Sequence, residues 1–360
     1  MIPLHIDEDI RRARTLPAAF YRDPAYWALQ RDKLWPSTWH YVADAAELAE
    51  PGRIAPFTLL PGVLDEPLLL SHTRDGQRFC LSNVCTHRGK ILVEEAGPQR
   101  LIRCGYHGRC FGLDGSCRSM PAFEDVPDFP TTEDHLPRLP LREWLGLHFT
   151  SLDPILDWPE LIRPLEARIG FLPLETLRFS PEKSPTFTVR AHWALYVDNY
   201  LEGLHIPFVH PALNQAIAFE EYAYELFPYA NLQIGVAKED EPSFELPTGH
   251  PDYGQRIYAY YFWVFPNLMF NFYPWGLSLN IVEPLSPALT RVRFRSYVLP
   301  DTPFDRAANA LDLTELEDEQ VVESVQQGVQ SRLYHHGRFS PTMEPNVHHF
   351  HRLLAQWLGG

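Results

Sequence analysis

The chain has 360 residues, of which 45% are hydrophobic, with 31 Lys and Arg residues against 46 Asp and Glu residues. This length, together with an ordinary apolar content and no low-complexity segment, predicts a globular protein of two domains. The formal net charge of −15 disfavours nucleic acid as a partner, and the lack of a signal core or of an apolar run of about 18 residues predicts a cytoplasmic protein without a membrane partner.

Residues 1–40 are predicted to form a helical segment that packs on the second domain. The stretch 20–44, FYRDPAYWALQRDKLWPSTWHYVAD, carries aromatic residues at roughly helical spacing. Between residues 41 and 155, short apolar runs are separated by Pro, Gly and Asp, which is typical of a small antiparallel β-domain. The proline-rich stretch 152–166 then marks a domain boundary.

Residues 156–360 are predicted to form an α+β domain in which helices cover a large antiparallel sheet. Long strands are expected at 186–197, 224–237, 256–265, 268–284 and 291–300. In the last of these, Val292, Phe294 and Val298 alternate with polar residues, as a strand with one dry face requires. Helical periodicity follows at 312–331 and again near the C-terminus, at 348–358.

Five cysteines lie within a window of 38 residues in the first domain, whereas a disulfide scaffold distributes its cysteines along a short secreted chain. This clustering indicates a metal site. The residues are Cys80, Cys85, Cys104, Cys110 and Cys117.

Two of these cysteines belong to paired Cys and His motifs, Cys85-x-His87 and Cys104-x-x-His107, which are separated by sixteen residues. Each loop supplies one thiolate and one imidazole, the arrangement of a [2Fe-2S] cluster in which one iron takes both sulfurs and the other takes both nitrogens. Two alternatives stay open here. A single zinc ion could take all four ligands, although zinc motifs usually pair Cys with Cys and His with His; the thiols and histidines could also be merely buried.

A second motif, Glu202-x-x-His205-x₄-His210, lies in the larger domain. Glu202 and His205 are three residues apart and share a helical face, while Pro207 should end the helix and free His210 to approach from the next loop. Both imidazoles can then reach one ion. Alone, the motif could equally be a helix cap with ordinary core histidines.

A carboxylate would complete a site of two histidines and one acid, the set that non-haem iron enzymes use. On the helix at 312–331, Asp318 is predicted to lie on the inward face, and Glu315 is the second choice. The inward face is defined by the stripe Val322, Val325 and Val329. Glu317 and Glu319 are predicted to face water.

The segments NVCTHRG (83–89) and CGYHG (104–108) resemble the cluster loops of the Rieske non-haem iron oxygenases, the aromatic-ring-hydroxylating alpha-subunit family. The resemblance implies that Cys85 and Cys104 bind one iron, and that His87 and His107 bind the other. Arg109 departs from the pattern, since most such oxygenases have Trp there. This departure puts the local packing or a partner surface in question.

The same resemblance extends to the second motif and implies a mononuclear Fe(II) bound by His205, His210 and Asp318. Glu202 would be the carboxylate that bridges His205 to a cluster histidine of a neighbouring subunit, and Asn199 would lie close to the iron. The remaining cysteines, Cys80, Cys110 and Cys117, are interpreted as structural thiols.

The function implied is that of a terminal oxygenase, which uses O₂ and electrons from NAD(P)H delivered by a flavin-containing reductase, with or without a ferredoxin. Family members form homotrimers. The chain is most similar in appearance to the choline, glycine betaine and carnitine monooxygenase branch, which implies hydroxylation or oxidative N-demethylation of a small quaternary ammonium substrate. One alternative is an aromatic-ring-hydroxylating mono- or dioxygenase; another is an electron-transfer or zinc-binding protein without oxygenase activity.

A cationic substrate would need an aromatic cage, a set of aromatic faces around the charged nitrogen. Most aromatic residues in the sheet simply fill the core, so each candidate has that simpler interpretation as well. The candidates from the sequence are Tyr200, Phe208, Tyr260, Trp263, Phe270, Phe272 and Trp275.

Overall fold

The computed structural model describes residues 4–300, 302 and 305–359. The chain divides into two compact units, one running from Pro36 to Ile155 and the other combining the N-terminal residues up to Trp35 with residues from Leu156 onward. The sequence places the domain boundaries at 40/41 and 155/156. Among the described residues, no helix is long and apolar enough to cross a membrane.

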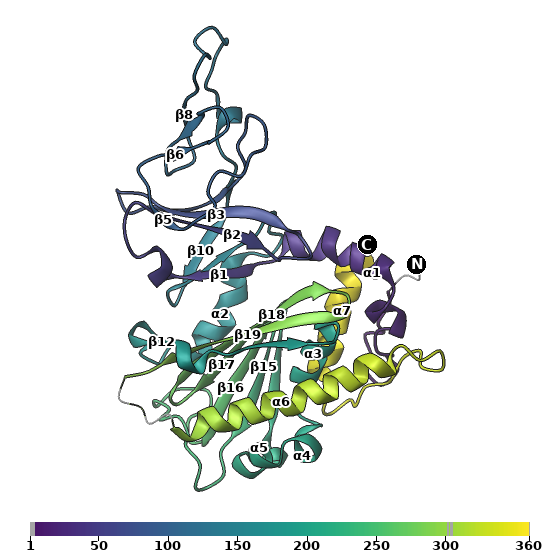
Figure 1. Ribbon diagram of the computed structural model, residues 1–360. Helices are drawn as coiled ribbons and strands as arrows, with labels where there is room; N and C mark the ends of the chain where they lie inside the picture. The colour runs from purple at the N-terminus through teal and green to yellow at the C-terminus, as the bar shows by residue number, and fades with distance from the viewer. Residues whose placement is uncertain (1–3, 301, 303–304, 360) are drawn as a thin grey trace. The chain divides into compact units, whose positions relative to one another are not determined.

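The smaller unit is built from three antiparallel sheets (Figure 1). A five-stranded sheet has the order β5-β2-β3-β4-β9, and two three-stranded sheets have the orders β1-β11-β10 and β6-β7-β8. The strands are β1 (His40–Asp44), β2 (Arg53–Leu59), β3 (Glu66–His72), β4 (Arg78–Ser82), β5 (Gly97–Pro98), β6 (Ile102–Arg103), β7 (Cys110–Phe111), β8 (Cys117–Ser119), β9 (Arg138–Leu139), β10 (Leu141–Trp144) and β11 (Leu147–Thr150).

The larger unit contains an eight-stranded antiparallel sheet with the order β12-β19-β18-β17-β16-β15-β14, in which β13 also pairs with β19. Strands β15, β17 and most of β18 are buried on both faces, including polar residues such as Asn231, Gln233 and Asn271. The strands are β12 (Arg178–Ser180), β13 (Thr186–Val189), β14 (Ala223–Phe227), β15 (Ala230–Val236), β16 (Ile257–Val264), β17 (Leu268–Tyr273), β18 (Gly276–Ser286) and β19 (Leu289–Val298).

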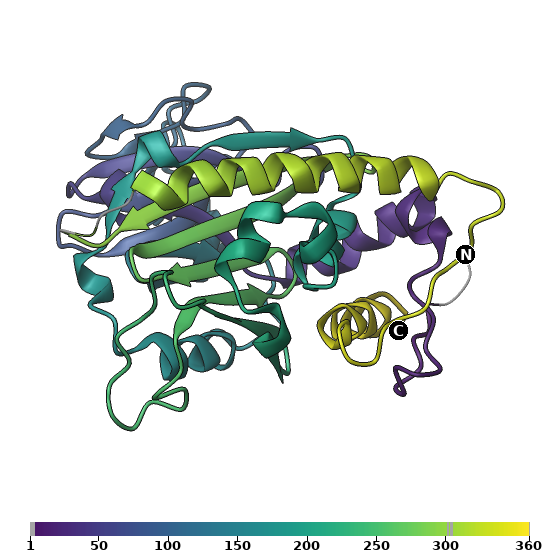
Figure 2. The same ribbon diagram turned by 90° about the horizontal axis from the view of Figure 1, so that it is seen from below.

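Helices cover this sheet. The long helix α6 runs across one face, with α3 in contact with both α6 and β18 (Figures 1 and 2). The fold class is therefore the predicted α+β arrangement. The helices are α1 (Pro24–Leu29), α2 (Trp158–Ile169), α3 (Trp193–Tyr200), α4 (Ile206–Val209), α5 (Pro211–Ala216), α6 (Asp305–Gly328) and α7 (Pro345–Gly359).

The N-terminal segment packs on α3 in the larger unit. Trp193 donates its indole N–H to Oε1 of Gln30 over 2.7 Å, and its ring meets that of Trp35 edge-on at 4.8 Å. The helical prediction for residues 20–44 was wrong at its end, because His40–Asp44 form strand β1.

Three long strands of the prediction were also wrong. Residues 224–237 form two antiparallel strands, β14 (Ala223–Phe227) and β15 (Ala230–Val236), rather than one. Residues 186–197 form β13 and then the start of α3, because His192 caps the helix by accepting a hydrogen bond from the N–H of Ala194. Residues 268–284 form two strands that meet at a turn. There Gly276 adopts φ +147°, and a Cβ would collide with the carbonyl of Tyr297. A short apolar run does not by itself distinguish a strand from a buried helix.

Candidate metal centres and the adjoining cavity

The two loops that carry Cys85 and Cys104 have the same backbone geometry. In each loop the cysteine N–H donates to the carbonyl five residues further on, over 2.9 and 2.8 Å. The cysteine carbonyl accepts from Gly89 in the first loop and from Gly108 in the second, over 3.0 and 3.1 Å. Both glycines have positive φ, +70° and +77°, which lets the chain close these tight turns.

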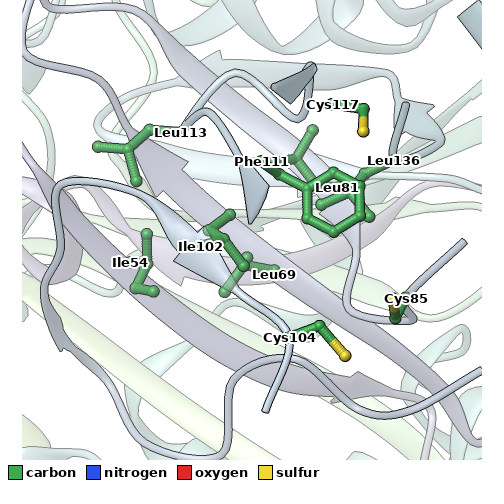
Figure 3. Packing of buried hydrophobic residues seen from close by; sticks show 10 residues of the cluster. All are labelled: Ile54, Leu69, Leu81, Cys85, Ile102, Cys104, Phe111, Leu113, Cys117 and Leu136. Carbon is green, nitrogen blue, oxygen red and sulfur yellow. The ribbon is translucent and has the colours of Figure 1, made fainter. Parts of the chain in front are cut away.

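The four motif residues separate into a buried pair and a surface pair. Cys85 and Cys104 are buried at the lower edge of an apolar cluster that contains Leu69, Leu81, Ile102 and Phe111 (Figure 3). Outside this core, the rings of His87 and His107 have centroids 4.8 Å apart, and His107 is exposed to solvent. The sulfurs therefore lie on the protein side of the site and the imidazoles on the solvent side.

Backbone N–H groups point at both sulfurs. Those of His87 and Arg88 reach Cys85, and those of Tyr106 and His107 reach Cys104. Burial opposes ionisation of Cys104, but these N–H groups lower the pKa of its thiol. At Cys85 burial outweighs the N–H groups and the pKa of the thiol is raised, so it is the Cys104 loop that favours the thiolate, the form in which cysteine binds iron or zinc.

A binuclear cluster and a single zinc ion place different demands on the spacing of the ligand atoms. Ligand atoms that share one zinc ion at about 2.0–2.3 Å lie within about 4 Å of one another. In the part of the chain that the structure describes, three such atoms come within 4.8 Å of one another at one place only, His205, His210 and Asp318. Among the described residues, the four residues of the two loops form no such group of three; a cluster with two metal atoms needs only two pairs, the two sulfurs on one iron and the two nitrogens on the other.

The second motif lies where α3 ends and the short helices α4 and α5 begin. His205 precedes α4, His210 lies between α4 and α5, and Asp318 comes from the middle of α6. Nε2 of His210 lies 3.1 Å from Nε2 of His205 and 2.9 Å from Oδ1 of Asp318, and the third distance, from His205 to Asp318, is 3.6 Å. Ligands at right angles around one ion at about 2.1 Å lie about 3 Å apart, so this group fits three adjacent positions of an octahedral metal ion.

Each imidazole of this group is oriented by a carboxylate. Nδ1 of His205 lies 2.6 Å from Glu202, and Nδ1 of His210 lies 2.8 Å from Glu317. With its Nδ1 proton donated to a carboxylate, each ring presents a bare Nε2 to the centre of the group, as metal-bound histidines do. Burial opposes protonation of His210, but Asp318 and Glu317 together raise its pKa, so the group attracts positive charge.

The prediction that Glu317 faces water was wrong, because its carboxylate contacts His210. The predicted valine stripe was wrong at one position as well: Val322 and Val329 are buried, whereas Val325 is 43% exposed. Glu319, also predicted to face water, is partly buried, and this burial raises its pKa.

The two candidate carboxylates from α6 have different surroundings. Asp318 meets the two imidazoles, whereas Glu315 accepts a hydrogen bond from the hydroxyl of Tyr196 over 2.6 Å. Glu315 is buried one turn from Asp318 and lines the same cavity. Its position makes it part of the wall rather than of the three-residue group.

A cavity of about 480 Å³ opens beside this group, and Asn199, Glu202, His205, His210 and Asp318 all border it. Tyrosine is the most frequent residue in the wall, which also includes Trp275 and Phe294. The tyrosines are Tyr196, Tyr200, Tyr222, Tyr258, Tyr261 and Tyr273.

Of the seven aromatic residues expected to form a cage, Tyr200 and Trp275 line the cavity. Tyr260, Trp263, Phe270 and Phe272 are instead fully buried in the core, and Phe208 is 83% exposed. The other wall tyrosines were missed. Strand register separates some of these residues: Tyr261 pairs with Asn271 and both line the cavity, whereas the next pair, Tyr260 and Phe272, does not.

Comparison with protein families gives a match for each of the two domains. Residues 174–360 match the family described as ring hydroxylating alpha subunit (catalytic domain), and residues 38–130 match the Rieske [2Fe-2S] domain. The carnitine monooxygenase oxygenase subunit of Escherichia coli (strain K12) is 29% identical over 377 residues, covering 99% of this chain and 97% of the relative. Choline monooxygenase from Arabidopsis thaliana is 28% identical over 366 residues, covering 96% and 83%.

Solved structures share the fold. A quaternary ammonium Rieske monooxygenase superposes with a TM-score of 0.80 at 24% identity, covering 99% of this chain and 98% of the other. A naphthalene 1,2-dioxygenase superposes with a TM-score of 0.71 at 17% identity, covering 96% and 92%. Together with the family matches, this identifies the chain as a member of the ring-hydroxylating alpha-subunit family, a Rieske non-haem iron oxygenase with a [2Fe-2S] cluster in one domain and an iron centre in the other.

Proposed function

We propose that this oxygenase oxidises a C–H bond of a small quaternary or tertiary ammonium cation that carries no carboxylate. The observation that carries this proposal is the wall of the cavity beside His205, His210 and Asp318. The wall is rich in tyrosine and in carboxylates, and none of its described residues is a lysine or an arginine.

The aromatic part of the wall suits a cation. Tyr273 and Trp275 stack with their ring centroids 4.9 Å apart and their planes 10° apart. The faces of such rings attract an ammonium group, by about 2 kcal/mol or more where water is excluded. Asp240 and Glu241 border the same cavity and add negative charge.

The lack of a basic wall residue argues against a substrate that also carries a carboxylate. A carboxylate that is buried without a cationic partner keeps much of its desolvation cost, even where neutral groups donate hydrogen bonds to it. The described wall offers amide and tyrosine groups instead, among them Asn199, Gln233 and Asn280. A choline-like cation therefore fits this wall better than glycine betaine or carnitine.

We assign the iron ligands on the same basis. His205, His210 and Asp318 would hold the mononuclear Fe(II), which supplies O₂ binding and activation when bound. Glu202 keeps His205 in the tautomer with a bare Nε2 and would bridge to a cluster histidine of a neighbouring subunit, while Asn199 would contact the substrate side of the cavity. Cys85 and Cys104 would hold one iron of the cluster, and His87 and His107 the other.

The reaction consumes O₂ with two electrons and two protons. One oxygen atom enters the C–H bond and the other leaves as water. We propose that a flavin-containing reductase, with or without a ferredoxin, supplies the electrons from NAD(P)H, and that the enzyme is a cytoplasmic homotrimer. The exposure of Leu204 and Phe208, which flank the iron site, supports coverage of this surface by another subunit.

The test is O₂ uptake by the enzyme with a surrogate reductase and NADH, with choline, glycine betaine, L-carnitine and naphthalene compared at equal concentration. We expect choline to be oxidised with a kcat/KM at least about tenfold above that of either carboxylate-bearing cation, because those substrates must bury a carboxylate without a cationic partner. Tenfold corresponds to about 1.4 kcal/mol. Labelled O₂ should leave one labelled atom in the initial hydroxylated product. A preference for L-carnitine would refute the substrate assignment, and a naphthalene diol would favour the aromatic-ring alternative.

A further inference from the structure

Arg109 lies in the second cluster loop, two residues after His107, and is only 3% exposed. Its guanidinium donates to Oγ1 of Thr86 over 2.8 Å and to Oδ1 of Asp134 over 3.1 Å. Thr86 lies between Cys85 and His87 in the other loop. Arg109 thus connects the two cluster loops, and it places a positive charge between them.

Two aromatic rings also flank this charge. The guanidinium carbon lies 5.1 Å from the ring centre of Phe129 and 5.7 Å from that of Phe123. Phe123 in turn meets the ring of His87 edge-on, with centroids 5.8 Å apart. Only one aromatic ring therefore separates the guanidinium from an imidazole of the cluster site, and little water is present to screen the charge.

Asp134 carries the compensating negative charge. The backbone N–H of Thr131 is the largest cause of its lowered pKa, and burial opposes this while Arg109 adds to it. The side chain of Asp134 is 22% exposed, against 4% for that of Arg109. Water screens the carboxylate more than the guanidinium, so the positive charge dominates the field at the cluster loops.

We propose that the Arg109–Asp134 pair sets the reduction potential of the cluster, with the guanidinium raising it and the carboxylate lowering it. Reduction adds one electron to the cluster and makes it more negative. A nearby buried cation stabilises this reduced form, and a nearby anion destabilises it. This role goes beyond the oxygenase reaction, since it decides how readily the cluster accepts an electron from a reductase and passes it on.

A purely mechanical role is the competing explanation, because the same guanidinium joins Thr86 in one loop to its own loop. A mechanical role and an electrostatic role differ in sign. If the contact is only mechanical, removing Arg109 or removing Asp134 should change the reduction potential of the cluster in the same direction. If the charges matter, removing the positive charge and removing the negative charge should shift the potential in opposite directions.

The experiment compares the midpoint potential of the cluster in the holoenzyme and in the variants Arg109→Gln, Arg109→Lys and Asp134→Asn, followed by circular dichroism and by the EPR signal of the reduced cluster. We expect a lower potential for Arg109→Gln, a higher potential for Asp134→Asn, and a smaller shift for Arg109→Lys than for Arg109→Gln. Arg88→Gln is the matched control: it removes the same charge beside His87, but Arg88 is exposed and screened by water, so its shift should be the smallest.

Shifts of the same sign in Arg109→Gln and Asp134→Asn, or no shift in either, would overturn the proposal and leave Arg109 as a mechanical connection. If Arg109→Gln does not assemble a cluster, Asp134→Asn still decides the matter, because an unchanged or lower potential in that variant contradicts the assigned sign. The shifts should also persist from low to high salt, since the charge is buried; shifts that vanish in high salt count against a buried origin.

Discussion

Nε2 of His205 and Nε2 of His210 lie 3.1 Å apart, although the Nδ1 atom of each ring is already directed at a carboxylate. With both Nδ1 protons held by carboxylates, both Nε2 atoms can act as acceptors for one cation, either a proton or a metal ion. Asp318 adds a third acceptor at 2.9 Å from His210. The arrangement therefore makes chemical sense as a site for a divalent cation, and its stability as well as its activity should depend on the metal.

The first prediction concerns Asp318. In Asp318→Ala the mononuclear iron should be lost, because two imidazoles remain where the site uses three protein ligands. Iron per chain should fall from three atoms to two, while acid-labile sulfide and the visible spectrum of the cluster stay unchanged. Metal analysis of anaerobically purified protein measures this. Full iron content and full turnover in Asp318→Ala would show that the ligand assignment is wrong.

The second prediction concerns Glu317, which lies on the same helix and whose substitution should weaken iron binding less than that of Asp318. Its carboxylate lies 2.8 Å from Nδ1 of His210 and does not belong to the three-residue group itself. Glu317→Gln should weaken the site by about 10–100-fold in iron affinity, the usual cost of losing the group that orients a metal-bound histidine. Titration with Fe(II) under argon gives the affinity. An effect as complete as that of Asp318→Ala would mean that Glu317 is itself a ligand.

The third prediction distinguishes the cysteines proposed to bind the cluster from the cysteines proposed to be structural. Cys85→Ala and Cys104→Ala should abolish the cluster, with loss of acid-labile sulfide. Cys80→Ala should retain it: burial raises the pKa of this thiol to about 12, so the residue stays protonated and acts as a small apolar side chain. Cys110→Ala should retain the cluster as well. Loss of sulfide in Cys80→Ala, with the protein still folded by circular dichroism, would contradict this division.

Much of the two candidate metal sites could be predicted from the sequence, because most of the proposed ligands lie close together along the chain. The loops 83–89 and 104–108 each hold a complete pair of ligand types, and Glu202, His205 and His210 fall within nine residues. Asp318 was predicted from the periodicity of its helix even though one of the valines that defined the inward face, Val325, is exposed. The predicted inward face of the helix was therefore only approximately right, but it was accurate enough to select Asp318.

The cavity wall could not be predicted in the same way. It depends on which face of the sheet each aromatic residue occupies, and strands β16 and β17 are apolar on both faces. Without alternation there is no sequence signal for register, and a shift of one residue exchanges the two faces. Glu317 was missed for a related reason, because its partner His210 lies 107 residues away and approaches from a loop.

The fourth prediction concerns Glu202, which accepts from Nδ1 of His205 over 2.6 Å and from its backbone N–H over 3.1 Å. Glu202→Gln removes the charge that favours the bare Nε2 of His205, and it removes the proposed bridge to the cluster. Substrate-dependent O₂ uptake should fall by at least about 10–100-fold. Reduction of the cluster by the reductase should keep its wild-type rate, which stopped-flow absorbance measures. A slower reduction step would place the defect in the cluster domain instead.

The last prediction compares two aromatic residues of the same sheet region that differ in surroundings. Trp275 lines the cavity and stacks on Tyr273, whereas the hydroxyl of Tyr260 donates to Asp252 in the core over 2.7 Å. Trp275→Leu should raise the KM for the cationic substrate by about 30-fold, which corresponds to the loss of about 2 kcal/mol of cation–π attraction. Tyr260→Phe should leave the KM unchanged and lower the free energy of unfolding by about 1–3 kcal/mol, because the buried carboxylate of Asp252 loses a donor. Steady-state kinetics and urea unfolding of both variants test the pair together. The same KM in Trp275→Leu and in the wild type would show that Trp275 does not contact the substrate. A raised KM in Tyr260→Phe would show that Tyr260 belongs to the substrate site after all.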